Sequence, residues 1–195
     1  MVKGAPLIVV VAGPNGVGKS TTAPLLLRRA LSVSEFVNAD QIALGLSAFK
    51  PEAVAISAGR VMMDRIKTLA RSRVDFAFET TLASRGFAPW LKELRGAGYR
   101  VHLAFLSLPD PELALARVAE RVRMGGHDVP EDVVVRRYYS GLKNLFDIYQ
   151  AIVDSWQVFD NTELSGPHLI AYGSVGKPAT IVDPVAWDHL KEKTR

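Results

Sequence analysis

The stretch GPNGVGKS, residues 13–20, decides the fold of this sequence. It matches the phosphate-binding loop pattern, with both fixed glycines followed by a lysine and a hydroxyl residue. An apolar, branched run, Leu7–Val11, precedes it, and a helical pattern from Lys19 to Leu31 follows. A buried strand, a glycine turn and a helix N-terminus together let backbone N–H groups converge on a phosphate group. We therefore expect a nucleoside triphosphate, ATP or GTP, to bind at this loop.

Two side chains of the loop have specific expected roles. Lys19 is expected to reach the β- and γ-phosphates, and the Ser20 hydroxyl is expected to ligate Mg²⁺. The residues that the pattern assigns to nucleotide binding are Gly13, Pro14, Asn15, Gly16, Val17, Gly18, Lys19, Ser20 and Thr21.

Outward from the loop, apolar strand-like runs alternate with amphipathic helical runs. This alternation predicts an α/β fold with a mainly parallel sheet, and 195 residues without a linker predict one domain over residues 1–195. Further strands are predicted at Glu35–Asn38, Val74–Phe78, Tyr99–Leu106 and Trp156–Phe159, with a terminal hairpin at His168–Tyr172 and Thr180–Val182. Helices are predicted at Pro51–Arg71, Phe87–Ala97, Pro111–Met124, Pro130–Val153 and Val185–Lys191.

Composition excludes several classes of protein. The sequence has no cysteine, which rules out disulfides and thiolate metal sites. The net charge is +4, but the basic residues are spread along the chain, which favours phosphate pockets over a nucleic-acid track. No apolar run is long enough to span a membrane, and no signal-peptide pattern is found, so we expect a cytoplasmic protein.

The first candidate acid is Asp40. It closes the triplet Asn38-Ala39-Asp40, just past a predicted strand, and the carboxyl ends of such strands face the ligand. Asp40 is therefore a candidate to accept a proton from an acceptor hydroxyl, or to orient it. The pattern fits equally well a helix cap, with Asp40 capping a short helix that begins at Gln41.

Two further strands end in an acid. Glu79-Thr80-Thr81 follows an apolar run, so Glu79 could hold Mg²⁺ through water or bind substrate, and Thr81 could donate to substrate. For Thr80 a satisfied strand end is the better interpretation. Asp160 also ends an apolar run, and there a cap of the turn into Asn161 is favoured. The sequence leaves open which of the two acids is Walker-B-like.

Arginines cluster around a glycine break at Gly125-Gly126. A helical lid is predicted over about residues 117–137, and arginines on a lid can close over a γ-phosphate while water is excluded. The alternative is that these side chains lie on solvated helix faces. The candidates are Arg117, Arg121, Arg123, Arg136 and Arg137.

Taken in order, these motifs resemble the zeta-toxin-like P-loop kinases over residues 7–161. The resemblance rests on residues 13–21, 38–40 and 79–81, on RVRMGGHDVP at 121–130, and on RRY at 136–138. It implies a three-layer P-loop fold with sheet order 2-3-1-4-5. It also implies Asp40 as catalytic base and Glu79 and Thr81 on the substrate side. Its lid arginines would be Arg123 and Arg136, in preference to Arg121 and Arg137.

The best-known members of that family are toxins that phosphorylate UDP-N-acetylglucosamine and are restrained by a small antitoxin. The family's longer substrate-binding insertions are not found here. We therefore expect a kinase that moves the γ-phosphoryl group of ATP or GTP to a small-molecule hydroxyl, with UDP-N-acetylglucosamine as the leading acceptor. The alternatives are a kinase of another metabolite or nucleoside, or a nucleotide-dependent ATPase switch. No LSGGQ signature accompanies Gly125-Gly126, which argues against a transport ATPase.

Overall fold

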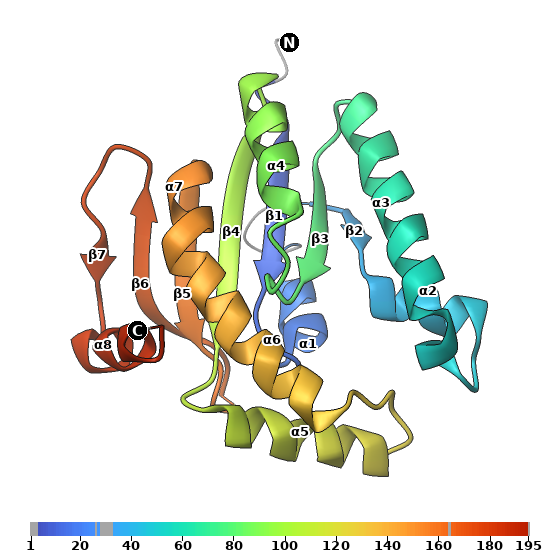
Figure 1. The fold of residues 1–195 in the computed structure, drawn as a ribbon. Helices are drawn as coiled ribbons and strands as arrows, with labels where there is room; N and C mark the ends of the chain where they lie inside the picture. The colour runs from blue at the N-terminus through green and yellow to red at the C-terminus, as the bar shows by residue number, and fades with distance from the viewer. Residues whose placement is uncertain (1–3, 26, 28–32, 164, 195) are drawn as a thin grey trace.

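A computed structural model describes residues 4–25, 27, 33–163 and 165–194 of the chain. Its centre is a seven-stranded sheet with the strand order β2-β3-β1-β4-β5-β6-β7 (Figure 1). The strands are β1 (Leu7–Ala12), β2 (Glu35–Val37), β3 (Phe76–Thr80), β4 (Arg100–Ser107), β5 (Ser155–Asp160), β6 (His168–Ser174) and β7 (Thr180–Ile181).

The first five strands confirm the predicted α/β class and the predicted order 2-3-1-4-5. All of their pairings are parallel. The predicted terminal hairpin forms β6 and β7, and β6 pairs antiparallel with β5, so the sheet extends beyond the predicted five strands. The third strand runs two residues further than predicted because Glu79 and Thr80 continue the ladder opposite Val11 and Ala12.

Helices connect these strands. They are α1 (Lys19–Leu25), α2 (Ala39–Leu46), α3 (Ala55–Arg71), α4 (Phe87–Gly96), α5 (Pro111–Arg123), α6 (Glu131–Asn144), α7 (Gln150–Ile152) and α8 (Pro184–Glu192). A 3₁₀ turn, η2 (Pro51–Val54), precedes α3, and a π-helical turn, η3 (Leu145–Tyr149), joins α6 to α7. None of the helices in the described part of the chain combines the length and apolar composition needed to cross a bilayer.

Two helix predictions need correction, and a third can be compared only in part. The helix predicted from Pro51 begins with the 3₁₀ turn Pro51–Val54, and its α-helical part starts at Ala55. The helix predicted over Pro130–Val153 is divided by the π turn. The helix predicted from Lys19 to Leu31 is described as far as Leu25; residues 26 and 28–31 lie outside the described residues.

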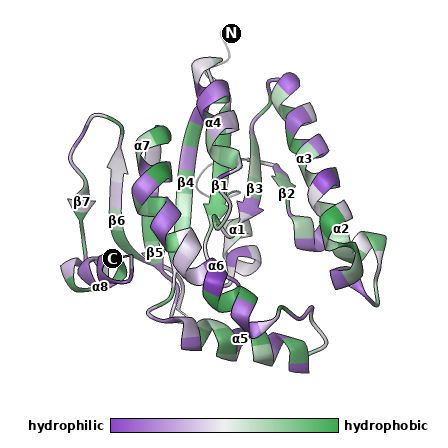
Figure 2. Ribbon diagram, viewed as in Figure 1, coloured by the Kyte–Doolittle hydropathy of each residue, from purple (hydrophilic) through white to green (hydrophobic). Residues whose placement is uncertain are grey.

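The sheet is covered on both faces because side chains alternate along its strands. Ile8 and Val10 pack in the cluster that includes side chains of α3, α4 and α6, whereas Val9 and Val11 pack with Ala23 of α1. Figure 1 shows α3, α4 and α6 over one face of the sheet. Figure 2 shows that β1 is mainly hydrophobic, while the helices carry alternating hydrophilic and hydrophobic bands. This three-layer arrangement agrees with the predicted architecture.

The parallel strands bring the motifs together. Because β1, β2 and β3 run in the same direction, the segments that follow them emerge at one edge of the sheet, near α1 and the crossing helix α5 (Figure 1). The glycine loop follows β1, Asn38 follows β2, and Glu79 lies near the end of β3. Three motifs that are far apart in the sequence therefore meet at one place.

Candidate active site

The glycine loop lies between β1 and α1, with α5 packed against it. Gly16 has a positive φ of 78°. A Cβ atom at this position would lie 2.5 Å from the Ala114 carbonyl oxygen of α5, so only glycine fits here. Asn161, from the segment after β5, donates its Nδ2–H to the Val17 carbonyl oxygen at 2.6 Å. The loop is therefore held from two sides, which fixes where its lysine points.

Lys19 is almost completely buried, with 6% of its surface exposed. Its Nζ donates to the Pro14 carbonyl oxygen at 2.9 Å and lies 3.6 Å from Glu79 Oε1. Burial lowers the pKa of the Lys19 ammonium below its ordinary value, and the carboxylates of Glu79 and Asp40 oppose that shift. A buried cation facing a cavity is arranged to receive an anionic ligand.

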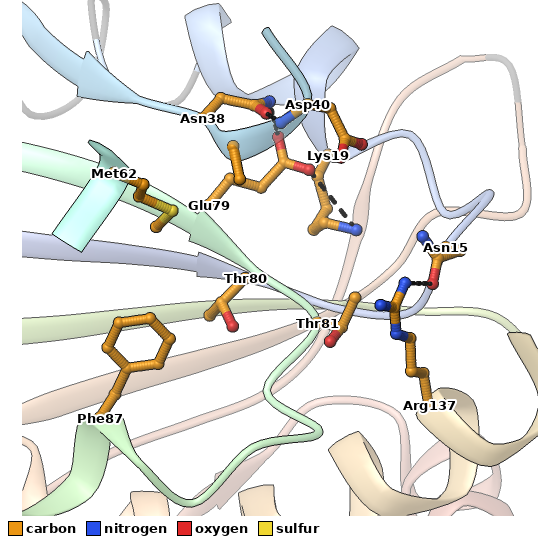
Figure 3. Close-up of a pocket in the computed structure, with 11 residues that line it drawn as sticks. Asn15, Lys19, Asn38, Asp40, Met62, Glu79, Thr80, Thr81, Phe87 and Arg137 are labelled. Atoms are coloured by element: carbon orange, nitrogen blue, oxygen red, sulfur yellow. Dashed lines mark hydrogen bonds and ion pairs between the residues drawn. The ribbon is translucent and has the colours of Figure 1, made fainter. Parts of the chain in front are cut away.

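Glu79 joins Lys19 to two other motifs. Ser20 Oγ donates to Glu79 Oε2 at 2.8 Å. Asn38 Nδ2 donates to the same oxygen at 2.7 Å (Figure 3). A serine hydroxyl and a carboxylate oxygen at the phosphate-binding loop are hard oxygen ligands of the kind that Mg²⁺ prefers. This donor set therefore fits the predicted magnesium site, with Ser20 as ligand and Glu79 beside it.

Asp160, the other acid at the end of a strand, has a different role. Its Oδ1 accepts a hydrogen bond from the Thr162 backbone N–H at 2.9 Å and another from the Thr162 hydroxyl. It thus caps the turn after β5, as the sequence favoured. Of the two acids, Glu79 is the one that contacts Lys19 and Ser20.

The capping interpretation of Asp40 is wrong. The helix that contains it, α2, begins at Ala39, and its N-cap is Asn38. Asn38 Oδ1 accepts from the Asp40 N–H at 2.7 Å and from the Gln41 N–H at 3.3 Å. The Asp40 side chain is exposed in the first turn of α2, where its carboxylate acts electrostatically on both Lys19 and Arg137.

Two cavities adjoin this cluster. The larger, of about 620 Å³, lies between the glycine loop and α5, and Ser20, Thr21 and Arg121 are among its lining residues. The smaller, of about 200 Å³, is lined by Met62 and Phe87 together with polar groups that include Thr81 (Figure 3). The two cavities share four lining residues, which are Asn15, Lys19, Asp40 and Glu79.

The arginines of the predicted lid differ in where they point. Arg121 lines the larger cavity, and its Nε and Nη2 are shielded from solvent without a hydrogen-bond partner among the described residues. Arg137 lines the smaller cavity and donates to Asn15 Oδ1 at 3.3 Å. Burial lowers the pKa of the Arg137 guanidinium, and Asp40 opposes that shift.

The pair that the resemblance preferred points elsewhere. The Arg123 side chain is 73% exposed and pairs with Glu120 at 3.0 Å on the surface of α5. Arg136 is exposed on α6 and lines neither cavity. Arg117 does reach the larger cavity, but its guanidinium donates to the carbonyl oxygens of Asn161 and Thr162 at 2.9 and 2.6 Å. Of the five candidate arginines, Arg117, Arg121 and Arg137 line the cavities, and the guanidinium group of Arg117 is bonded to backbone carbonyl oxygens.

Sequence reasoning missed the apolar wall of the smaller cavity. Met62, on α3, packs in the core and also faces the cavity. Phe87, at the start of α4, lies opposite in the same lining. Periodicity marks a side chain as inward-facing, and it carries no information on whether a cavity lies there.

Comparison with known proteins gives a consistent family assignment. The AAA domain family matches residues 8–139, which include the glycine loop, Asp40, Glu79 and both halves of the lid. A protein of Haemophilus influenzae (strain ATCC 51907 / DSM 11121 / KW20 / Rd) described as uncharacterized is 30% identical over 130 residues, covering 67% of this chain and 91% of that protein.

Solved structures share the fold. The AvrRxo1-ORF1:-ORF2 complex with ATP contains a chain with a TM-score of 0.71 and 17% identity, covering 98% of this chain and 65% of that one. This chain thus spans less than two thirds of that relative's length. A chain of the PezAT chromosomal toxin–antitoxin system of Streptococcus pneumoniae has a TM-score of 0.68 and 15% identity, covering 99% of this chain and 86% of that one.

Proposed function

The chain belongs to the AAA domain family as a P-loop, kinase-like domain, and on that premise we propose that it is a small-molecule kinase. In this proposal it transfers the γ-phosphoryl group of ATP or GTP to a hydroxyl group. The observation that carries the proposal is the pair of cavities that meet at Lys19, Asp40 and Glu79. A nucleotide switch needs only the cavity at the glycine loop, whereas a kinase needs a second one for its acceptor.

The proposed reaction is an in-line displacement at the γ-phosphorus. The acceptor oxygen forms the new O–P bond, the bond from phosphorus to the β,γ-bridging oxygen breaks, and the nucleoside diphosphate leaves. Asp40, which lines both cavities, accepts the hydroxyl proton. Lys19 binds the phosphates from the loop. Arg121 and Arg137 offset the charge of the transferring group from α5 and α6.

The metal has a defined place in the proposal. Ser20 would hold Mg²⁺ together with phosphate oxygens, and Glu79 would support it through water. When bound, Mg²⁺ supplies positive charge that offsets the charge of the β- and γ-phosphates.

The acceptor that we propose to test first is UDP-N-acetylglucosamine, with the chain acting as a zeta-type toxin under a small antitoxin. Two considerations support this choice: the ordered motifs resemble that family, and the structural relatives include chains of a toxin–antitoxin system and of the AvrRxo1 complex. The smaller cavity has room for a compact group, with Met62 and Phe87 as an apolar wall and Thr81 as a polar contact.

A phosphoryl-transfer screen tests this function. The protein is incubated with γ-labelled ATP or GTP, Mg²⁺ and a panel of nucleotide sugars, nucleosides and sugars, and labelled products are separated. We expect transfer to a hydroxyl of UDP-N-acetylglucosamine. Transfer to another member of the panel would keep the kinase and replace the acceptor. Nucleotide hydrolysis that no member of the panel accelerates would support an ATPase switch instead.

The lid arginines give a second prediction. Arg121→Ala and Arg137→Ala should each lower kcat by on the order of a hundredfold, with a smaller effect on ATP affinity, because their charge acts mainly on the transition state. Arg123→Ala and Arg136→Ala are matched controls on the same two helices, and their kcat should change by less than about threefold. Single-turnover transfer and ATP titration on the four variants make the comparison. A loss confined to Arg123→Ala and Arg136→Ala would instead support the pair of lid arginines that the resemblance implies.

A further inference from the structure

The segment Thr80–Ser84, which starts at the last residue of β3, forms part of the smaller cavity and has an unusual backbone. Thr80 and Thr81 line the cavity, and Leu82, next in sequence, has a φ of 61° although it is not a glycine. The Leu82 side chain is fully buried in the core. A left-handed conformation at a leucine is unfavourable, so the surrounding structure has to hold it in place.

Two groups bond the Leu82 backbone: Thr80 Oγ1 accepts from its N–H at 3.1 Å, and Asn144, the last residue of α6, binds its carbonyl oxygen. This side chain is only 3% exposed, and its Nδ2 donates to the Leu82 carbonyl oxygen at 2.9 Å and to the Ala83 carbonyl oxygen at 3.1 Å. Its Oδ1 accepts from Arg85 Nε at 3.2 Å. One buried amide therefore makes three hydrogen bonds: two to the carbonyl oxygens of the strained residue and of the residue after it, and one to Arg85, just beyond the segment.

Other residues of α6 reach the same region. Gly141 approaches the segment so closely that a Cβ atom would overlap the Thr81 carbonyl oxygen. Arg137, one turn earlier, donates to Asn15 of the glycine loop. Positions 137, 141 and 144 lie on one side of a helix, since they are four and three residues apart. The helix thus touches the nucleotide loop at one end of this face and the cavity segment at the other.

The helix also changes form where these contacts end. The π-helical turn Leu145–Tyr149 starts directly after Asn144, and Tyr149 Oη donates to the Ser84 carbonyl oxygen at 2.8 Å. A π turn adds a residue and rotates the helix face that follows, and such turns occur frequently at functional sites. Here it lets Asn144 and Tyr149, which are five residues apart, both bond the same segment.

We propose that Asn144 is a positioning residue for the acceptor: it holds Thr80–Ser84 so that Thr81 faces the smaller cavity, at a fixed place relative to the nucleotide loop. The functional part rests on the proposed function, because it takes that cavity to be the acceptor site. Asn144 contacts no reacting group itself. Loss of its two donated bonds should loosen the segment and weaken acceptor binding while the nucleotide site stays intact.

Two variants disturb the segment in independent ways. Asn144→Asp keeps the size of the side chain and the oxygen that Arg85 contacts, but removes both Nδ2–H donors to the carbonyl oxygens. Gly141→Ala instead pushes against the Thr81 carbonyl oxygen, while alanine itself favours the helix. Tyr138→Phe is the matched control, because Tyr138 is a buried residue of α6 that donates to the Leu108 carbonyl oxygen and makes no contact of this kind with the segment.

Hydrogen exchange on the full chain, followed by mass spectrometry of peptides, gives the first readout. Amide exchange of residues 79–88 should become about tenfold faster in Asn144→Asp and in Gly141→Ala, while exchange of residues 8–21 should change little. In Tyr138→Phe, exchange should change little everywhere except at Leu108. Faster exchange spread evenly over the chain, or no local change in either variant, would overturn the proposal. This readout does not depend on any acceptor, so it stands apart from the proposed function.

Kinetics with UDP-N-acetylglucosamine as the acceptor probe give the second readout. Both variants should raise the acceptor KM about tenfold, while the Kd for ATP, measured by titration, stays within about twofold. An equal weakening of ATP and acceptor would mean that Asn144 supports the whole site rather than the acceptor segment. A normal acceptor KM together with fast local exchange would overturn the functional part, because the segment would then not position the acceptor.

Discussion

Lys19→Met should abolish phosphoryl transfer, with a loss of roughly a thousandfold or more, and should weaken ATP binding strongly. Lys19 is the cation on the glycine loop itself, and it is already desolvated before any nucleotide binds. Its interaction with phosphate oxygens is therefore stronger than that of a solvated lysine. Methionine preserves the length of the apolar stem and removes only the charge and its donors.

The same substitution should leave the fold intact. Glu79 loses its ion pair with Lys19, but Ser20 and Asn38 still donate to Glu79 Oε2. The cost of losing one partner of a buried ion pair comes from the charge left uncompensated, and the two remaining donors to Glu79 limit that cost. Lys143→Met serves as the control, because Lys143 pairs with Asp147 on the surface of the chain at 2.7 Å. Calorimetric titration with Mg-ATP, thermal melts and labelled transfer on both variants make the test. Unchanged ATP affinity in Lys19→Met would show that the glycine loop does not bind the nucleotide.

Much of the fold was predictable because one motif fixes its neighbours. A phosphate-binding loop requires a buried strand before it and a helix after it, and the alternation of apolar runs supplied the remaining parallel strands. The additional antiparallel strands were predicted as a hairpin, but their attachment to β5 was not. Strand pairing at a sheet edge depends on contacts between distant segments, and local patterns do not contain that information.

The lid arginines show that spacing along the chain and position on a helix face can favour different residues. Arg123 and Arg136 matched the family in their separation, yet they face solvent here. The sequence did contain a signal that favours Arg121: it is three residues after Val118, which is buried, and so lies on the inward side of α5. Residues two apart on a helix point in nearly opposite directions, so Arg121 and Arg123 cannot both face the cavity. The helix face, rather than the separation along the chain, decides which arginine reaches the cavity.

The contacts of Asn144 could not be predicted from the sequence. Nothing in the pattern Gly-Leu-Lys-Asn marks it, because a buried amide at the end of a helix is recognisable only with its partners. Those partners, the carbonyl groups of Leu82 and Ala83, lie about sixty residues away along the chain. The strained backbone at Leu82 was equally hidden, since leucine gives no sign of a left-handed conformation.

The second large effect is expected at Asp40, which the structure separates from the capping role. Asn38, and not Asp40, caps α2, so removing the Asp40 carboxylate leaves the cap hydrogen bonds unchanged. Asn38→Ala is therefore the variant expected to lose stability, by about 1 kcal/mol or a few degrees in Tm. Asp40→Asn and Asp40→Ala should both melt close to the original protein.

Asp40→Asn should nevertheless lower single-turnover transfer by on the order of a thousandfold, while ATP affinity changes little. The reason is that asparagine has nearly the same shape as aspartate but cannot accept the hydroxyl proton at the point where the two cavities meet. ATP affinity should rise slightly, because a negative charge near Lys19 is removed.

Glu52→Gln, at an exposed carboxylate of η2, controls for the general effect of lost negative charge. The decisive comparison is transfer against melting temperature on the Asp40 and Asn38 variants. Near-normal transfer by Asp40→Asn would exclude Asp40 as the base, and a drop in its Tm matching that of Asn38→Ala would return it to a structural role in α2.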